Sequence, residues 1–304
     1  MDTGEQLYET EATGWQRGLY DDIKHTFRAP IVNWIFRTTM ANYPDFLRYA
    51  WGQLKPLYTT RAFARFSTDY RDAALSPVES SGDAADSSAS GSSIPIYRRE
   101  DLGVAPAEYR ELRGQLATFD VVAPRLAVLF EVTDRALHDE PVGTEPDENY
   151  AATAPPPAWL DRDRGRSPTM IAAGEVPDNL GGVVESIEDF HGLSGTLPSI
   201  YRCLCQWPAY LDRAWADLEP VVRSEGFEAA CEGARERTEA FAAATPYRPR
   251  LDPDSLDEVG FDDAAIEDLQ ELFERFNRGA VETVIPALPV YAATLDASGC
   301  RELR

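Results

Sequence analysis

Two stretches of the chain, YPDFLRYAWGQLKP at residues 43–56 and WPAYLDRAWADLEP at residues 207–220, align without a gap. The second residue of each is a proline, which suits the first turn of a helix because that turn does not use its N–H groups. Pro56 and Pro220 close the two stretches and predict where each helix stops. Between the prolines, apolar side chains recur at helical spacing: Leu47, Trp51 and Leu54, then Leu211, Trp215 and Leu218. Both stretches are therefore predicted to be helices, and they resemble two copies of one element.

A second pair of segments matches at a similar offset. The residues in register are Gly103, Leu112, Leu116 and Phe119 in one segment and Gly260, Leu269, Phe273 and Phe276 in the other. The apolar members of each set lie on one helix face, and Pro106 or Asp262 near the start is an opening signal. No segment alternates as a strand would. We predict an all-α chain built from two copies of one helical module, residues 1–138 and 171–304.

Two segments have the composition of connections. Residues 76–95 are acidic and serine-rich without periodicity, which is typical of a mobile loop inside the first repeat. Residues 139–170 are rich in proline and end in a mixed-charge run. They are predicted to link the two repeats.

The composition restricts the partners. The chain has 304 residues, 43% of them hydrophobic, and a net charge of −23, which argues against binding to nucleic acid or to an anionic membrane surface. No apolar run approaches the ~20 residues of a membrane span, and the acidic N-terminus does not resemble a signal peptide. Only Lys24 and Lys55 are lysines, so arginine supplies almost all cations. This pattern predicts a cytoplasmic protein of a haloarchaeal type; the alternative is an acidic protein from a GC-rich mesophile.

The sequence contains no glycine-rich phosphate loop and no metal or redox motif, and it predicts no cofactor and no metal site. Cys203 and Cys205 are two residues apart and cannot share a helix face, which favours buried structural thiols. Of the three histidines, His191 is the only one with a functional interpretation to weigh. Capping or packing is favoured for it over a catalytic role.

Three features together resemble the group I 2-haloacid dehalogenases, which act on both D and L enantiomers. They are GLYDDIKHTFRAP at residues 18–30, the paired proline helices with Trp207-Pro208, and the paired late helices. The resemblance covers roughly residues 15–60, 100–135 and 180–295. It implies an α-helical pseudo-dimer with the active site between the repeats, similar to the alkylhydroperoxidase and carboxymuconolactone-decarboxylase group. It also implies a reaction in which an aspartate activates water to displace halide from C2 of a short carboxylic acid, with inversion.

The chain departs from this family where the chemistry should occur. The resemblance places the catalytic aspartate directly after a serine and eight residues before the proline of the second repeat, which is Ile200, after Ser199. No carboxylate stands at residues 197–202. The other implied pocket positions carry Ile31, Trp34, Ala123 and Phe273. We therefore expect an apolar cleft without the family's base, and dehalogenase activity that is altered or absent.

Three hypotheses follow. The chain is a hydrolase of a 2-substituted short carboxylic acid whose base has moved, the candidates being Glu185, Glu188, Asp189 and Asp120. Alternatively it binds a small apolar or carboxylate ligand without catalysis, or it is a structural helical protein with a filled cleft. A carboxylate near Ser199 would favour the first, an open apolar pocket the second and a filled interior the third. A homodimer is compatible with all three.

Overall fold

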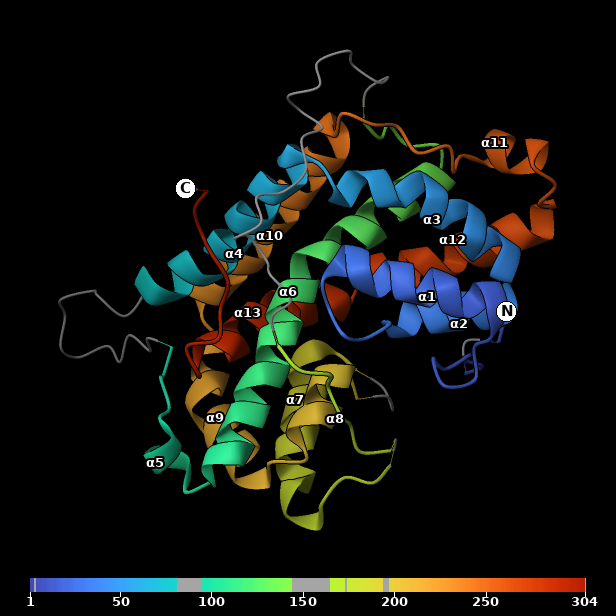
Figure 1. Cartoon of the computed structure of the whole chain (residues 1–304). Helices are drawn as coiled ribbons and strands as arrows, with labels where there is room; N and C mark the ends of the chain where they lie inside the picture. The colour runs from blue at the N-terminus through green and yellow to red at the C-terminus, as the bar shows by residue number, and fades with distance from the viewer. Residues whose placement is uncertain (3, 81–93, 144–164, 173, 194–196, 304) are drawn as a thin grey trace.

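The computed structural model describes residues 1–2, 4–80, 94–143, 165–172, 174–193 and 197–303. Within these ranges all regular secondary structure is helical, which confirms the predicted all-α class (Figure 1). Most of the predicted loop, residues 81–93, and most of the predicted linker, residues 144–164, lie outside the described residues.

The helices fall into two series along the chain. The first series is α1 (Gly14–Phe27), α2 (Trp34–Asn42), α3 (Pro44–Tyr58), α4 (Arg61–Ser80), α5 (Arg99–Leu102) and α6 (Pro106–Leu137). The second is a short 3-10 turn (Asp178–Leu180), α7 (Gly181–His191), α8 (Ser199–Leu204), α9 (Pro208–Val222), α10 (Glu225–Ala244), α11 (Pro253–Glu258), α12 (Asp263–Asn277) and α13 (Val281–Ala293).

The two series repeat one another in length and in cap geometry. Helices α3 and α9 both have 15 residues, and α4 and α10 both have 20. The residues before α3 and α9 share an unusual backbone conformation, with φ −134° and ψ 67° at Tyr43 and φ −121° and ψ 70° at Trp207. Helices α1 and α7 both end in a left-handed cap, at Arg28 and Gly192. A duplicated module predicts such agreement.

Two details of the sequence prediction are wrong. Helices α3 and α9 continue past Pro56 and Pro220 to Tyr58 and Val222. A proline this close to the end of a helix removes only one backbone hydrogen bond, and burial of the residues that follow, Leu57 and Val221, compensates. Residues 76–80, which were expected in the loop, are the last turn of α4 because Val78 is buried in the core.

The long helix α6 runs through the middle of the molecule, in contact with α1, α4, α10, α12 and α13 (Figure 1). Helices α4 and α10 pack closely against each other across the two series. A fully buried ion pair joins α4 to α6, with Arg71 Nε 3.0 Å from Asp120 Oδ2. The halves thus share one hydrophobic core, and α6 carries side chains toward helices of both series.

Candidate functional site

A small cavity lies where the start of α2, the N-terminal half of α6 and the start of α8 meet the end of α1. Its volume is about 20 Å³, enough for roughly one water-sized group. The lining residues are Phe27, Ile31, Asn33, Trp34, Arg37, Thr118, Phe119, Val122 and Ser199. The cavity therefore combines residues from both series of helices.

Local capping and ion pairs position these walls. The Trp51 indole N–H donates to Asp22 at 2.7 Å and Lys55 Nζ lies 2.8 Å from the same carboxylate, which fixes α1 against α3. The side chain of Asn33 caps α2 by accepting from the N–H of Ile35 at 3.2 Å. The positive end of the α2 dipole is therefore directed toward the cavity wall formed by Asn33.

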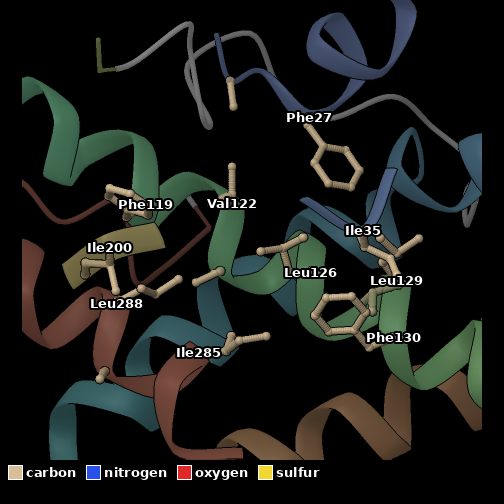
Figure 2. Packing of buried hydrophobic residues seen from close by; sticks show 14 of the residues in the cluster. Phe27, Ile35, Phe119, Val122, Leu126, Leu129, Phe130, Ile200, Ile285 and Leu288 are labelled. Carbon is tan, nitrogen blue, oxygen red and sulfur yellow. The ribbon is translucent and has the colours of Figure 1, made fainter. Parts of the chain in front are cut away.

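The structure separates the six residues that the sequence assigned to one pocket. Ile31, Trp34 and Ser199 line the small cavity, whereas Ala123, Ile200 and Phe273 are buried and do not. Ile200 points into the core beside Leu288, on the same side as Phe119 (Figure 2).

Trp34 and Phe273 pack against different aromatic rings. Phe273 packs against Phe46, with ring centroids 6.3 Å apart. Phe276 stacks on Trp34 at 4.6 Å and contacts Phe130 at 5.4 Å. Phe276 lies three residues after Phe273 on the same helix, α12.

None of the described residues that line the cavity is a carboxylate. Of the candidate substitutes, Asp120 is completely buried and accepts from Arg71 and from the N–H of Gly299 at 2.9 Å. Asp189 is exposed and pairs with Arg223 at 3.2 Å. Glu185 is exposed and Glu188 is only partly buried on α7. None of these four carboxylates lines the cavity, so none is in place to act as the relocated base of the first hypothesis.

Sequence reasoning missed Arg37. Its side chain is 8% exposed, lines the cavity, and carries an Nε that has no hydrogen-bond partner within the described ranges. The guanidinium stacks over the Tyr8 ring, 4.8 Å from its centre. Burial lowers the pKa of Arg37, although the group stays charged. An arginine directly after the apolar residues Trp34, Ile35 and Phe36 was the signal available in the sequence.

His191 belongs to a separate, buried polar chain. Its Nδ1 lies 2.7 Å from Thr283 Oγ1 and its Nε2 2.5 Å from the hydroxyl of Tyr201. Thr283 in turn donates to the carbonyl of Ala280 at 3.1 Å, so its oxygen accepts from Nδ1–H, and Tyr201 donates to Nε2. Burial lowers the pKa of His191 to about 3, which keeps the ring neutral. These contacts favour a packing role.

A larger cavity of about 450 Å³ lies between α4, α6, α10, α12 and α13. None of the predicted pocket residues lines it. Its lining carries two arginines and four glutamates, and one of these arginines, Arg235, pairs with Glu232 of the lining at 2.9 Å and with Glu239 at 2.5 Å. Glu131 accepts from Asn277 at 2.9 Å.

Comparisons with known proteins agree on one family. The family described as halocarboxylic acid dehydrogenase DehI matches residues 30–171. An (R)-2-haloacid dehalogenase of Rhizobium sp. (strain NHG3) is 27% identical over 250 residues, covering 82% of this chain and 90% of that protein. A configuration-inverting 2-haloacid dehalogenase of Pseudomonas sp. (strain 113) is 24% identical over 304 residues, covering 96% and 92%.

Solved structures agree on the fold. A D-2-haloacid dehalogenase in complex with L-LA superposes with a TM-score of 0.78 at 20% identity, covering 95% of each chain. A mutant of D-2-haloacid dehalogenase with D-2-CPA gives a TM-score of 0.77 at 20% identity, covering 95% of this chain and 94% of the other. At this level of identity the solved structures show a shared fold, and the curated relatives that the sequence resembles are 2-haloacid dehalogenases.

Proposed function

We propose that this chain does not hydrolyse 2-haloacids by the route that the family resemblance implies, and that its cavity instead holds a small anionic group. One observation carries the proposal. The cavity is lined by the buried Arg37, whose Nε has no hydrogen-bond partner among the described residues, and no described lining residue is a carboxylate. Such an environment favours an anion over a water that must be deprotonated.

The lack of a base decides against hydrolysis. General-base assistance is worth about 10²–10⁴-fold in rate, and Ile200 cannot accept a proton. The cavity, of about 20 Å³, has room for about one water-sized group as its walls stand. Leu288 and Phe119 lie beside Ile200 in the hydrophobic core (Figure 2).

The test is the formation of lactate from each enantiomer of 2-chloropropionate, followed by NMR. Both enantiomers are needed because the resemblance was to a group that acts on both, whereas the relative from Rhizobium is named for the (R) form. We expect no lactate above the buffer control. Turnover of either enantiomer by the unmodified protein would contradict the proposal.

Restoring the aspartate is the complementary test. Ile200→Asp alone should give no turnover, because Ala123 and the apolar side chains beside residue 200 remain. It should lower the free energy of unfolding by roughly 3 kcal/mol, since a carboxyl would enter an apolar site without a partner. Ile200→Asn, which has nearly the same shape but cannot act as a base, is the matched control. Turnover by Ile200→Asp alone would show that the cleft retains the rest of the family's machinery.

The composition leads us to expect a halophilic protein of the cytoplasm, and a homodimer remains a prediction. Surface carboxylates repel one another in dilute buffer, and salt shortens the Debye length from about 10 Å at 0.1 M to 3 Å at 1 M. The assays are therefore run both in dilute buffer and in molar potassium salt. A melting temperature that does not change between them would count against halophily.

A further inference from the structure

We infer that the cavity of about 450 Å³ between α4, α6, α10, α12 and α13 is a binding site for a protonated primary amine that carries a compact apolar body. Among the described residues it shares no lining side chain with the small cavity at Ser199, so the inference does not rest on the proposed function. It depends on three features of the larger cavity: its size and apolar inner walls, its surplus of hydrogen-bond acceptors, and the carboxylates at its mouth.

The size and the inner walls suit a small organic molecule. Ligand sites in proteins usually have volumes of roughly 300–1,000 Å³ and apolar walls with a few polar groups, and this cavity lies within that range. Its inner walls include Phe130, Ile285 and the ring of Tyr70, which are 4%, 6% and 2% exposed (Figure 2 labels the first two). The apolar body of a ligand would leave water for contact with these side chains, which favours binding.

Two polar groups of the lining are acceptors without a donor. The hydroxyl of the buried Tyr70 makes no hydrogen bond with a residue that the structure describes. This hydroxyl interacts electrostatically with the thiol of Cys231, another lining residue, so it is directed toward the cavity. Asn277 donates its N–H groups to Glu131 at 2.9 Å and to Asp134 at 2.8 Å, which leaves its amide oxygen as an acceptor. A ligand with several N–H donors would satisfy both groups.

The hydroxyl donors of the lining are already in use. Thr238 and Thr283 both donate to backbone carbonyls a few residues earlier in the chain, at 2.8 Å and 3.1 Å. A thiol such as that of Cys231 is only a weak donor. The cavity therefore offers mainly acceptors to an occupant.

The mouth of the cavity carries uncompensated negative charge. Each of the two lining arginines lies close to one lining glutamate, at 2.9 Å and at 3.7 Å. The other two glutamates, Glu228 and Glu282, are exposed and form no ion pair with a residue that the structure describes. Their charges reach into the cavity: the pKa of the Cys231 thiol is raised to about 12, first by burial and then by Glu282 and Glu228. A positive group at the mouth would be attracted to both carboxylates.

An organic ammonium group fits these features better than an inorganic ion or an anion. An ammonium group has three N–H donors and no acceptor, and the faces of the Tyr70 and Phe130 rings attract a cation. Across the described residues, no three His, Cys, Asp or Glu side chains are grouped so that they could hold a metal ion. An anionic ligand would meet Glu228 and Glu282 with like charge.

The experiment is isothermal titration calorimetry of the whole protein with three compounds that share one apolar body, in potassium chloride at constant ionic strength. The probes are 2-phenylethylamine, which is protonated at neutral pH, 2-phenylethanol, which is neutral, and 3-phenylpropionate, which is an anion. We expect saturable binding of the amine, binding of the alcohol that is at least about fivefold weaker, and no binding of the anion.

A pair of charge variants tests the mouth. Glu228→Gln combined with Glu282→Gln keeps the shape of both side chains and should weaken amine binding roughly tenfold. The matched control is Glu225→Gln combined with Glu236→Gln, which changes the net charge equally. Both control glutamates are exposed and lie on α10 outside the lining. Their replacement should weaken binding by less than about twofold, since salt screens distant charges.

Two further variants test the inner walls. Tyr70→Phe keeps the ring, removes the hydroxyl and should weaken amine binding about threefold. Ala127→Leu changes no charge but places a larger side chain in the lining, and it should abolish binding of the amine. The four glutamine substitutions are at exposed positions, so the charge comparison stands even if Ala127→Leu folds poorly.

Three outcomes would overturn the inference. Equal weakening in the two charge pairs would show general attraction to an acidic surface. Equal affinity for the amine and the alcohol would identify a neutral apolar site. Displacement of the amine by Mg²⁺ at a lower concentration than the amine itself would identify an inorganic cation site.

Discussion

The ends of α1 and α7 lie at matching places in the two helical series but are packed by different chemistry. Phe27 and His191 are the last residues of their helices, and each directly precedes a left-handed cap. Phe27 is surrounded by aromatic rings, with Tyr58 at 5.0 Å, Phe36 at 5.4 Å and Trp51 at 5.9 Å. His191 is surrounded by hydroxyls instead.

This difference shows that one backbone arrangement can either leave a cavity between its side chains or be packed without one. Rigid rings around Phe27 cannot fill every gap, and a small cavity remains beside them. His191 makes directional hydrogen bonds with Tyr201 and Thr283, so these polar groups lie close together and each has a partner. We call the end of α1 around Phe27 the aromatic end and the end of α7 around His191 the polar end. A functional role is therefore expected for the aromatic end, and a contribution to stability for the polar end.

The largest effect should come from removing the central ring of the aromatic end. Phe27 is 2% exposed, and Phe27→Ala should lower the free energy of unfolding by about 3–5 kcal/mol, the usual cost of such a truncation in a core. Denaturant unfolding measures it. Trp15→Ala, which removes a larger ring that is 43% exposed, should cost far less. Equal losses in the two variants would mean that the aromatic end is not a packed core.

The contribution of the polar end to the free energy of unfolding should depend on pH. His191 has a pKa of about 3 when folded, against about 6.5 in an unfolded chain, so the unfolded state binds its proton first. Its contribution is complete above pH 6.5 and is lost as pH falls toward 3. At about 1.4 kcal/mol per pH unit, the loss between pH 6.5 and pH 4 amounts to about 3 kcal/mol.

A comparison with His191→Phe isolates this contribution, because the many surface carboxylates titrate in both proteins. The difference in unfolding free energy between the unmodified protein and His191→Phe should shrink by about that 3 kcal/mol between pH 6.5 and pH 4. Parallel curves would show that the ring is protonated in the folded protein as easily as in the unfolded one.

The sequence was sufficient for the helices and insufficient for the site. Periodicity and the paired prolines located α3 and α9, since these signals are local and both helices bury the predicted stripe. The resemblance to a known family located Ser199 at the cavity, but it could not show that Ala123 and Phe273 lie outside the lining. Which residues enclose a 20 Å³ cavity depends on side-chain packing between distant segments, and Arg37 becomes conspicuous only once its missing partner is seen.

The smallest expected effect tests whether the polar end acts as one unit. Tyr201→Phe keeps the size of the ring but removes the hydroxyl that donates to His191 Nε2. His191→Phe removes that acceptor, so the buried hydroxyl of Tyr201 loses this hydrogen bond. Each single change should cost about 1–3 kcal/mol, because a buried polar atom loses its partner. The double variant removes both partners, so its cost should fall short of the sum by about 1–2 kcal/mol.

The corresponding cycle at the aromatic end, Phe36→Leu with Tyr58→Leu, has no directional bond to break. The coupling energy between Phe36 and Tyr58 should be smaller, because each of these rings packs against Phe27 and they interact with each other mainly through it. A Tyr201–His191 coupling near zero would mean that the 2.5 Å contact contributes only through packing, and the contrast between the two ends would then be one of shape rather than of hydrogen bonding.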